Sequence, residues 1–132
     1  QRRSIPMFAT YIGATLAGLT GAGIIYVGAR YLLAPQASAA TFGLPDWPHG
    51  DAGAWLSLKG IRDIVSGLVI LIPLALGQFH LLGWLLLAAS ITPLGDALVV
   101  IRNKGSKILG YAMHGGTAVA VAIAGLLLLL GS

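Results

Sequence analysis

Four long apolar stretches dominate this chain of 132 residues and limit what it can fold into. Each is close to the roughly 20 residues that a helix needs to cross the hydrocarbon core of a bilayer. We therefore expect an all-α, polytopic integral membrane protein. It would be a bundle of four transmembrane helices in one domain over residues 1–132, with the lipid bilayer around it. The stretches run from about Met7 to Leu33, Ala54 to Leu76, Phe79 to Ile101 and Lys107 to Leu130.

Composition supports a membrane environment. Hydrophobic residues make up 57% of the chain and charged residues 9%, whereas about a quarter of a soluble domain is charged. The net charge is +4, but the basic residues lie at helix ends and inside apolar runs, so we expect no nucleic-acid partner. There are no cysteines, which excludes thiol nucleophiles and thiolate metal sites.

The connections differ sharply in length. Short turns around Gly77 and at 103–106 predict antiparallel neighbouring helices. The stretch from Pro35 to Gly53 is rich in proline and glycine, and it predicts a long loop of the kind that often covers a binding site. Glycine and alanine are abundant in the first and fourth apolar stretches, which favours close helix packing within one chain over a dimer face. A homo-oligomer is left open.

Ionisable residues interrupt three of the apolar stretches at a similar depth. With a rise of 1.5 Å per residue, Lys59, Arg62 and Asp63 lie about 8–13 Å inside the end nearest the long loop. Asp96 lies about 9 Å and His114 about 10 Å from that same end. Because charges at such depth cost several kcal/mol against lipid, we expect these groups to face one another in the interior and to form a functional site.

Helical spacing adds neighbours to this cluster. Residues 59, 62 and 63 share one face of a helix, and residues 107, 111 and 114 line up on another. Arg30 and Tyr26 form an i, i+4 pair at the same end of the first stretch. We predict catalytic roles for Asp63, Asp96, His114, Arg62, Lys59 and Tyr111, and substrate-binding roles for Arg30, Tyr26, Trp55 and Asn103.

Structural interpretations compete with these roles. Lys59 and Asp63 would also suit an ion pair that only holds the bundle together, and His114 a core histidine bonded to a carbonyl. Tyr31, Trp47 and Trp55 fit an aromatic belt at the membrane interface. Pro93, one turn before Asp96, frees a carbonyl and predicts a kink. A single metal ion on Asp63, Asp96 and His114 is conceivable, but such clusters arise easily by chance, and we expect no metal and no cofactor.

Several motifs resemble those of one family. Arg30 and Pro35, the run Phe42-Gly43-Leu44-Pro45, the run Lys59-Gly60-Ile61-Arg62-Asp63, and then Asp96 and His114 follow in that order. This pattern resembles an uncharacterised family of small four-helix membrane proteins from fungi and bacteria, a domain of unknown function distantly similar to DoxX-like membrane proteins. The resemblance covers nearly the whole chain. It implies the four-helix fold and the importance of Arg62, Asp63, Asp96 and His114. Fungal members that resemble accessory genes of natural-product biosynthesis imply lipophilic substrates.

Three functions follow from this pattern. The first is a membrane-embedded enzyme that acts on a lipophilic small molecule by cofactor-free acid–base chemistry, such as isomerisation, cyclisation or epoxide opening. Asp63 and Asp96 would differ in protonation, His114 would serve as partner base, and Tyr111 would donate to a developing oxyanion. The second is a structural or accessory subunit of a membrane complex. The third is a proton-coupled transporter.

Overall fold

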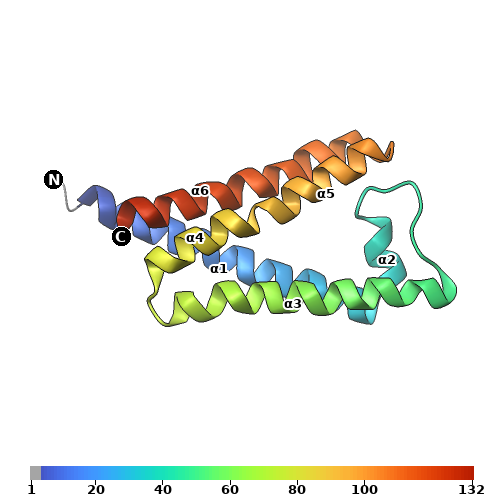
Figure 1. The fold of residues 1–132 in the computed structure, drawn as a ribbon, viewed down its shortest axis with the longest axis horizontal. Coiled ribbons are helices and arrows are strands. Elements are labelled where there is room, and N and C mark those ends of the chain that lie inside the picture. The colour runs from blue at the N-terminus through green and yellow to red at the C-terminus, as the bar shows by residue number, and fades with distance from the viewer. Residues whose placement is uncertain (1–3) are drawn as a thin grey trace.

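The computed structural model describes residues 4–132, and this part of the chain is all-helical, without a strand. The two ends of the chain lie at the same end of an elongated bundle (Figure 1). The long helices run side by side from there toward the short helix α2 at the other end. In chain order the elements are α1 (Ser4–Leu33), α2 (Pro35–Ala40), the 3-10 turn η1 (Gly50–Gly53), α3 (Ala54–Ala75), α4 (Phe79–Ala89), α5 (Ile91–Arg102), the π-helix η2 (Leu109–Gly115) and α6 (Gly116–Gly131).

Helices α1 and α3 form the most extensive helix pair. Two glycines seven residues apart on each helix meet in antiparallel order, Gly28 against Gly60 and Gly21 against Gly67. A Cβ added at Gly28 would lie 2.5 Å from the carbonyl oxygen of Gly60, and one at Gly60 would lie 2.6 Å from that of Gly28. The backbones therefore touch directly, as small residues permit in membrane helices.

The main core lies at the end of the bundle where the two chain termini are found. Helices α1, α3, α4 and α6 meet there. Its buried side chains are small or aliphatic, and no charged residue belongs to it: Ala17, Ile70, Leu82, Leu86, Val121, Ala124 and Leu128. Gly83 and Gly125 let α4 and α6 approach closely, because a Cβ at Gly125 would lie 2.8 Å from the carbonyl oxygen of Gly83. This end of the bundle is therefore closed and apolar.

The third apolar stretch is interrupted at Ser90, between α4 and α5. Pro93 explains the interruption, because it has no N–H to donate to the carbonyl four residues earlier and its ring crowds that turn. The Ser90 hydroxyl donates to the carbonyl of Leu87 at 2.7 Å within this break. The predicted kink therefore takes the form of a one-residue break at Ser90, six residues before Asp96.

The expectation of four transmembrane helices joined by a long loop is wrong. Within the described residues, three segments are long and apolar enough to cross a membrane, Met7–Leu33, Phe79–Arg102 and Leu109–Gly131. Helix α3 has 22 residues but carries Lys59, Arg62 and Asp63 close together, which sets it apart from these three. Length alone made it look like a fourth span, whereas charge is what separates it from the others.

The expected loop between Pro35 and Gly53 is also partly helical. Pro35 begins α2 instead of ending helical structure, since proline is tolerated in the first helical turn. The following segment folds back over the bundle. The Ser106 amide donates to the carbonyl of Gly43 at 2.8 Å, and Trp47 Nε1 donates to Gln36 Oε1 at 2.8 Å. The segment is therefore fastened both to α2 and to the turn after α5.

Candidate functional site

Lys59 and Asp63 form an ion pair on α3. Lys59 Nζ lies 2.7 Å from Asp63 Oδ2, with 32% of the lysine side chain and 13% of the aspartate side chain exposed. The ammonium group also sits over the ring of Tyr31, 4.2 Å from its centroid. The Gly28–Gly60 contact explains this arrangement, because it presses the start of α3 against the end of α1, where Tyr31 lies. Tyr31 itself is only 3% exposed.

His114 is held against the folded-back segment. Its Nε2 lies 2.7 Å from the carbonyl oxygen of Phe42, and the two rings pack against each other at a tilt of 45°, with centroids 4.3 Å apart. Because a carbonyl only accepts, Nε2 carries the proton and donates. The Phe42 ring also lies 5.4 Å from Lys59 Nζ. Phe42 therefore connects His114 on η2 with the ion pair on α3.

The π-helix η2 determines where His114 points. Gly110 packs against Ile101 of α5, where an added Cβ would lie 2.6 Å from the isoleucine side chain. A π-helical turn is wider than an α-helical turn, and such turns are frequent at functional sites. The α-helical relation that would place Tyr111 beside His114 therefore does not hold. His114 is buried, whereas Tyr111 is 66% exposed.

Asp96, on α5, belongs to the same cluster as Lys59, Asp63 and His114. Its carboxyl is half-buried and interacts electrostatically with His114, Lys59 and Asp63. In residues 4–132, however, it has neither a hydrogen bond nor an ion pair to any side chain. The cluster thus contains one carboxylate held by a lysine and a second one that is not held.

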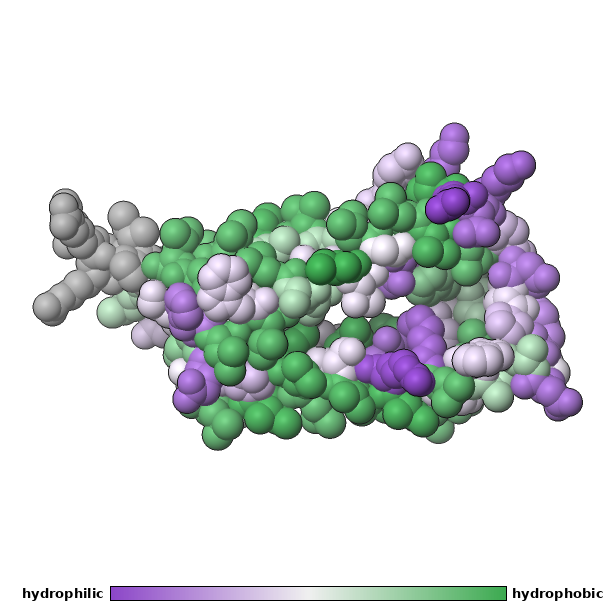
Figure 2. Space-filling model, viewed as in Figure 1, coloured by the Kyte–Doolittle hydropathy of each residue, from purple (hydrophilic) through white to green (hydrophobic). Residues whose placement is uncertain are grey.

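The helices that carry these groups, α3 on one side and α5 with η2 on the other, lie apart from each other. Helix α3 packs mainly on α1, and α5 mainly on η2, whereas α3 and α5 have almost no contact with each other. Figure 2 shows a hollow between the lobe of α5 and α6 and the lobe of α3, with hydrophilic side chains gathered toward the α2 end and apolar surface on both flanks. The ionisable cluster therefore lies where the bundle opens, at the opposite end from the apolar core.

Of the predicted site residues, Lys59, Asp63, Asp96 and His114 are brought together. Others lie outside this cluster. The exposed Arg62 donates from Nη1 to the carbonyl of Leu58 on its own helix, at 3.3 Å. Tyr111, Arg30, Tyr26 and Trp55 are exposed on the outer surface. Their catalytic and binding roles stay predictions.

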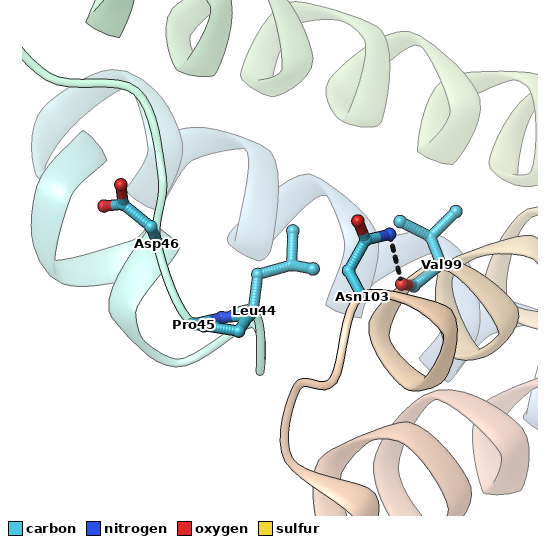
Figure 3. Close-up of a pocket in the computed structure, with 5 residues that line it drawn as sticks. All are labelled: Leu44, Pro45, Asp46, Val99 and Asn103. Carbon is cyan, nitrogen blue, oxygen red and sulfur yellow. Dashed lines mark hydrogen bonds between the residues drawn. The ribbon is translucent and has the colours of Figure 1, made fainter.

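Asn103 lines a separate, shallow pocket at the end of α5. Its Nδ2 donates to the carbonyl of Val99 at 2.8 Å. The pocket has a volume of about 430 Å³. Figure 3 shows Asn103 and Val99 on one side of it and the segment Leu44, Pro45 and Asp46 on the other. The pocket holds none of the clustered groups, so we place the candidate site at Lys59, Asp63, Asp96 and His114 instead.

Sequence reasoning missed two members of the cluster. Tyr31 was assigned to an aromatic belt, and Phe42 was noted only as part of a motif. For Tyr31 a signal was present, because the matching seven-residue glycine spacings, Gly21 with Gly28 and Gly60 with Gly67, predict the helix contact that places it beside Lys59. No local pattern indicates that Phe42 meets His114, since 72 positions separate them.

Two further observations concern ligands. Ser38 on α2 is buried, and its hydroxyl is the one fully enclosed side-chain oxygen without a hydrogen-bond partner in the described part of the chain. Between residues 4 and 132, no three His, Asp or Glu side chains lie in a group that could hold a metal ion. Asp63, Asp96 and His114 are thus near one another without forming a set of metal ligands.

Comparison with known proteins gives a family but no activity. No curated protein and no solved structure matches the chain. The family described as "Domain of unknown function (DUF4267)" matches residues 21–128, which include α3, α5, η2 and every member of the cluster. The match extends over most of the chain, and the protein therefore belongs to this domain family of unknown function.

Proposed function

We propose that this protein is a polytopic membrane enzyme that acts on a lipophilic small molecule by acid–base chemistry without a cofactor. The observation that carries the proposal is the contrast between two carboxylates at one site. Asp63 is bound by Lys59 at 2.7 Å, whereas Asp96 is unpaired within the described residues and half-buried beside it. Pairs of carboxyl groups in unlike environments are a recurrent basis for dividing acid and base roles.

Asp96 is the group that we expect to exchange a proton with the substrate. Asp63 is already engaged by the ammonium group of Lys59, which suits it to an electrostatic role. Asp96 has the freedom to accept a proton and return it. His114 lies within electrostatic range of Asp96 and is fixed by its bond to Phe42, so we expect it to adjust the charge state of Asp96.

The lipophilic character of the substrate follows from the surroundings. The hollow opens between apolar flanks, and three apolar helices are able to place the molecule in a bilayer. A substrate dissolved in the membrane would reach the cluster without crossing water. Isomerisation, cyclisation and epoxide opening all need a positioned acid and base in a dry site. Each of these reactions is redox-neutral, so none requires an oxidant or a reductant.

A structural or accessory role in a membrane complex is the second candidate. It is favoured by the Lys59–Asp63 ion pair and the His114–Phe42 bond, because both contacts also hold the open end of the bundle together. The unpaired carboxyl of Asp96 is unexplained by that role. Proton-coupled transport ranks third, because the core at the other end of the bundle is built from apolar side chains.

The test is turnover in lipid nanodiscs. The purified protein is incubated in D₂O buffer with lipophilic β,γ-unsaturated ketones, polyenes and terminal epoxides. The products are separated by chromatography, and their masses are measured by mass spectrometry. We expect conversion or deuterium uptake for at least one probe, and a loss of about 100-fold or more in Asp96→Asn. Asp51→Asn, an exposed aspartate of η1, is the matched control and should keep full activity.

The outcomes separate the two candidates. If no probe is converted in an Asp96-dependent way, the enzyme proposal fails. If Asp96→Asn also lowers the melting temperature as strongly as Asp63→Asn does, the accessory role is favoured. The relation to DoxX-like proteins, the fungal and bacterial range, and a place in natural-product biosynthesis stay predictions.

A further inference from the structure

A short basic turn joins two of the segments that are able to cross a membrane. The segments Phe79–Arg102 and Leu109–Gly131 end on either side of it, so the turn lies at the surface of a bilayer that holds them. It has three exposed basic side chains within six positions, Arg102, Lys104 and Lys107, which we call the basic turn. The turn lies at the α2 end of the bundle (Figure 1), where hydrophilic side chains gather (Figure 2).

The three cations of the basic turn are not neutralised within the described residues. Between residues 4 and 132 the ion pairs are Lys59 with Asp63 and His49 with Asp46. The side chains of the basic turn have neither an ion pair nor a hydrogen bond in this part of the chain. Asp46 lines the pocket beside Asn103, but its carboxylate is paired with His49 at 3.4 Å. Three positive charges are therefore left for a partner.

Lys104 has a backbone conformation that normally favours glycine. Its φ is 58°, in the left-handed region, where a side chain crowds the following carbonyl oxygen. The Lys104 N–H donates to the carbonyl of Ile101 at 3.2 Å, and the next N–H donates to the carbonyl of Val100 at 2.8 Å. These two bonds form the Schellman motif that ends many helices, and its left-handed residue is usually glycine. In this protein that residue is a lysine.

Neighbouring contacts hold the turn in this shape. Gly105 has no room for a side chain, because the carbonyl oxygen of Gly43 occupies the space that a Cβ would need. The Ser106 N–H donates to that same carbonyl at 2.8 Å. The glycine of the turn thus serves close packing, and Lys104 takes the strained position before it. Backbone strain of this kind is typical of functional positions, which points to a use for the lysine side chain.

Apolar side chains next to the turn indicate a lipid surface as the partner. Leu98 precedes the turn and Ile108 follows it, and both are exposed, Ile108 to 78%. Tyr111 is exposed as well, and tyrosine is common at the level of lipid headgroups. Long basic side chains beside apolar ones reach this level while their methylene groups stay in the apolar layer. A soluble anion would bind the cations but leave the apolar surface unexplained.

We propose that the basic turn binds the phosphate groups of anionic phospholipids and holds this end of the bundle at a membrane leaflet that contains them. Charge complementarity carries the proposal, because three cations without an internal partner lie at the level of the headgroup anions. Each basic residue near such a surface contributes about fivefold in affinity, and salt weakens the attraction. This lipid site is independent of the acid–base chemistry proposed above, and either can fail without the other.

The experiment measures lipid binding by the purified protein in a neutral detergent. Phosphatidylglycerol and phosphatidylcholine with the same fluorescent acyl chain are titrated, and fluorescence anisotropy is recorded with the signal from empty micelles subtracted. We expect the wild type to prefer phosphatidylglycerol about tenfold or more, and less at high salt.

Lys104→Gly separates binding from folding. It should weaken phosphatidylglycerol binding about fivefold and leave phosphatidylcholine binding unchanged. Its melting temperature should be the same or higher, because glycine adopts the left-handed conformation freely. Lys104→Arg keeps the charge and should bind as the wild type does. Arg62→Gln is the matched control, because it removes one exposed cation from α3, which has almost no contact with α5. It should change the affinity by less than about twofold.

Equal affinity of the wild type for the two lipids overturns the proposal, whatever the variants do. Unchanged phosphatidylglycerol binding in Lys104→Gly also overturns it, and Lys107→Gln replaces this variant if it does not fold. An equally large loss in Arg62→Gln would mean that net charge alone explains the binding, which is a third contrary outcome. Release of the lipid by sn-glycerol 3-phosphate at a similar concentration would show that a soluble phosphate suffices, and it would exclude a membrane lipid as the partner.

Discussion

His114 and Phe42 are joined twice although 72 positions separate them, by a hydrogen bond of 2.7 Å from Nε2 to the carbonyl and by a tilted contact of their rings. These contacts fasten the segment after α2 to the π-helix η2. At this end of the bundle Phe42 also packs against a second apolar cluster, formed by Tyr31, Ala39 and Leu56. The same histidine is thus a structural fastening and a neighbour of Asp96, and the two roles make different predictions.

His114→Ala should lower the melting temperature clearly. The substitution leaves the carbonyl of Phe42 without its donor and removes the ring contact, at a cost of about 1–3 kcal/mol. A thermal-shift assay in detergent measures it. His80→Ala is the matched control, because His80 is exposed and its ring nitrogens hydrogen-bond to Trp84 and Ser132, away from the cluster. Equal melting temperatures for the two variants would contradict the fastening role.

Lys59 and Asp63 should be coupled energetically. We expect a double-mutant cycle with Lys59→Met and Asp63→Asn to give a coupling of about 1 kcal/mol. Partial exposure of the lysine keeps the value below that of a fully buried pair, in which removal of one partner is far more costly. Chemical denaturation of the four proteins in detergent provides the free energies. Strictly additive effects would mean that the ion pair contributes nothing.

Asp96→Asn should behave differently from Asp63→Asn in a thermal-shift assay. Asp96 has no ion pair to lose in the described part of the chain, so its replacement by the isosteric amide should leave stability unchanged or raise it, as is common when an active-site charge is removed. Asp63→Asn leaves Lys59 without its partner and should be destabilising. A larger loss in Asp96→Asn than in Asp63→Asn would argue for a structural role of Asp96.

Gly60→Ala should force α1 and α3 apart. A Cβ at this position would lie 2.6 Å from the backbone carbonyl of Gly28, and overpacking of this kind costs about 1–3 kcal/mol. The displacement also moves Lys59 away from Tyr31, so we expect the melting temperature to fall. Gly23→Ala is the control, since nothing lies within 4 Å of its added Cβ, and it should be neutral or stabilising. Similar stability of the two variants would show that the helix contact is loose.

The protein should stay in the membrane pellet after washing with alkaline carbonate. Three apolar helices of sufficient length hold a protein far more firmly than surface attachment does. Immunoblotting of pellet and supernatant measures the outcome, with a peripheral membrane protein as the control that is released. Release of this protein into the supernatant would contradict integral insertion.

Part of the site was predictable and part was not. Lys59, Asp63, Asp96 and His114 interrupt apolar stretches, and the cost of exposing such groups to lipid predicts that they face one another. Arg62 obeys the same pattern, yet it lies on the surface. Helical spacing allowed Arg62 and Tyr111 to join the site, but spacing alone does not tell which edge of a face the neighbouring helix covers.

The sequence by itself determined that the chain is helical and apolar, and that its charges gather toward one end, because these properties depend on residue type and on distances along a helix. The tertiary structure decided that η2 turns His114 inward and Tyr111 outward, and that α1 and α3 approach closely enough to bring Lys59 over the ring of Tyr31. These features arise from contacts between distant segments, the Gly28–Gly60 crossing and the Phe42–His114 bond. Their energy depends on the shapes of both partners, which no local pattern contains.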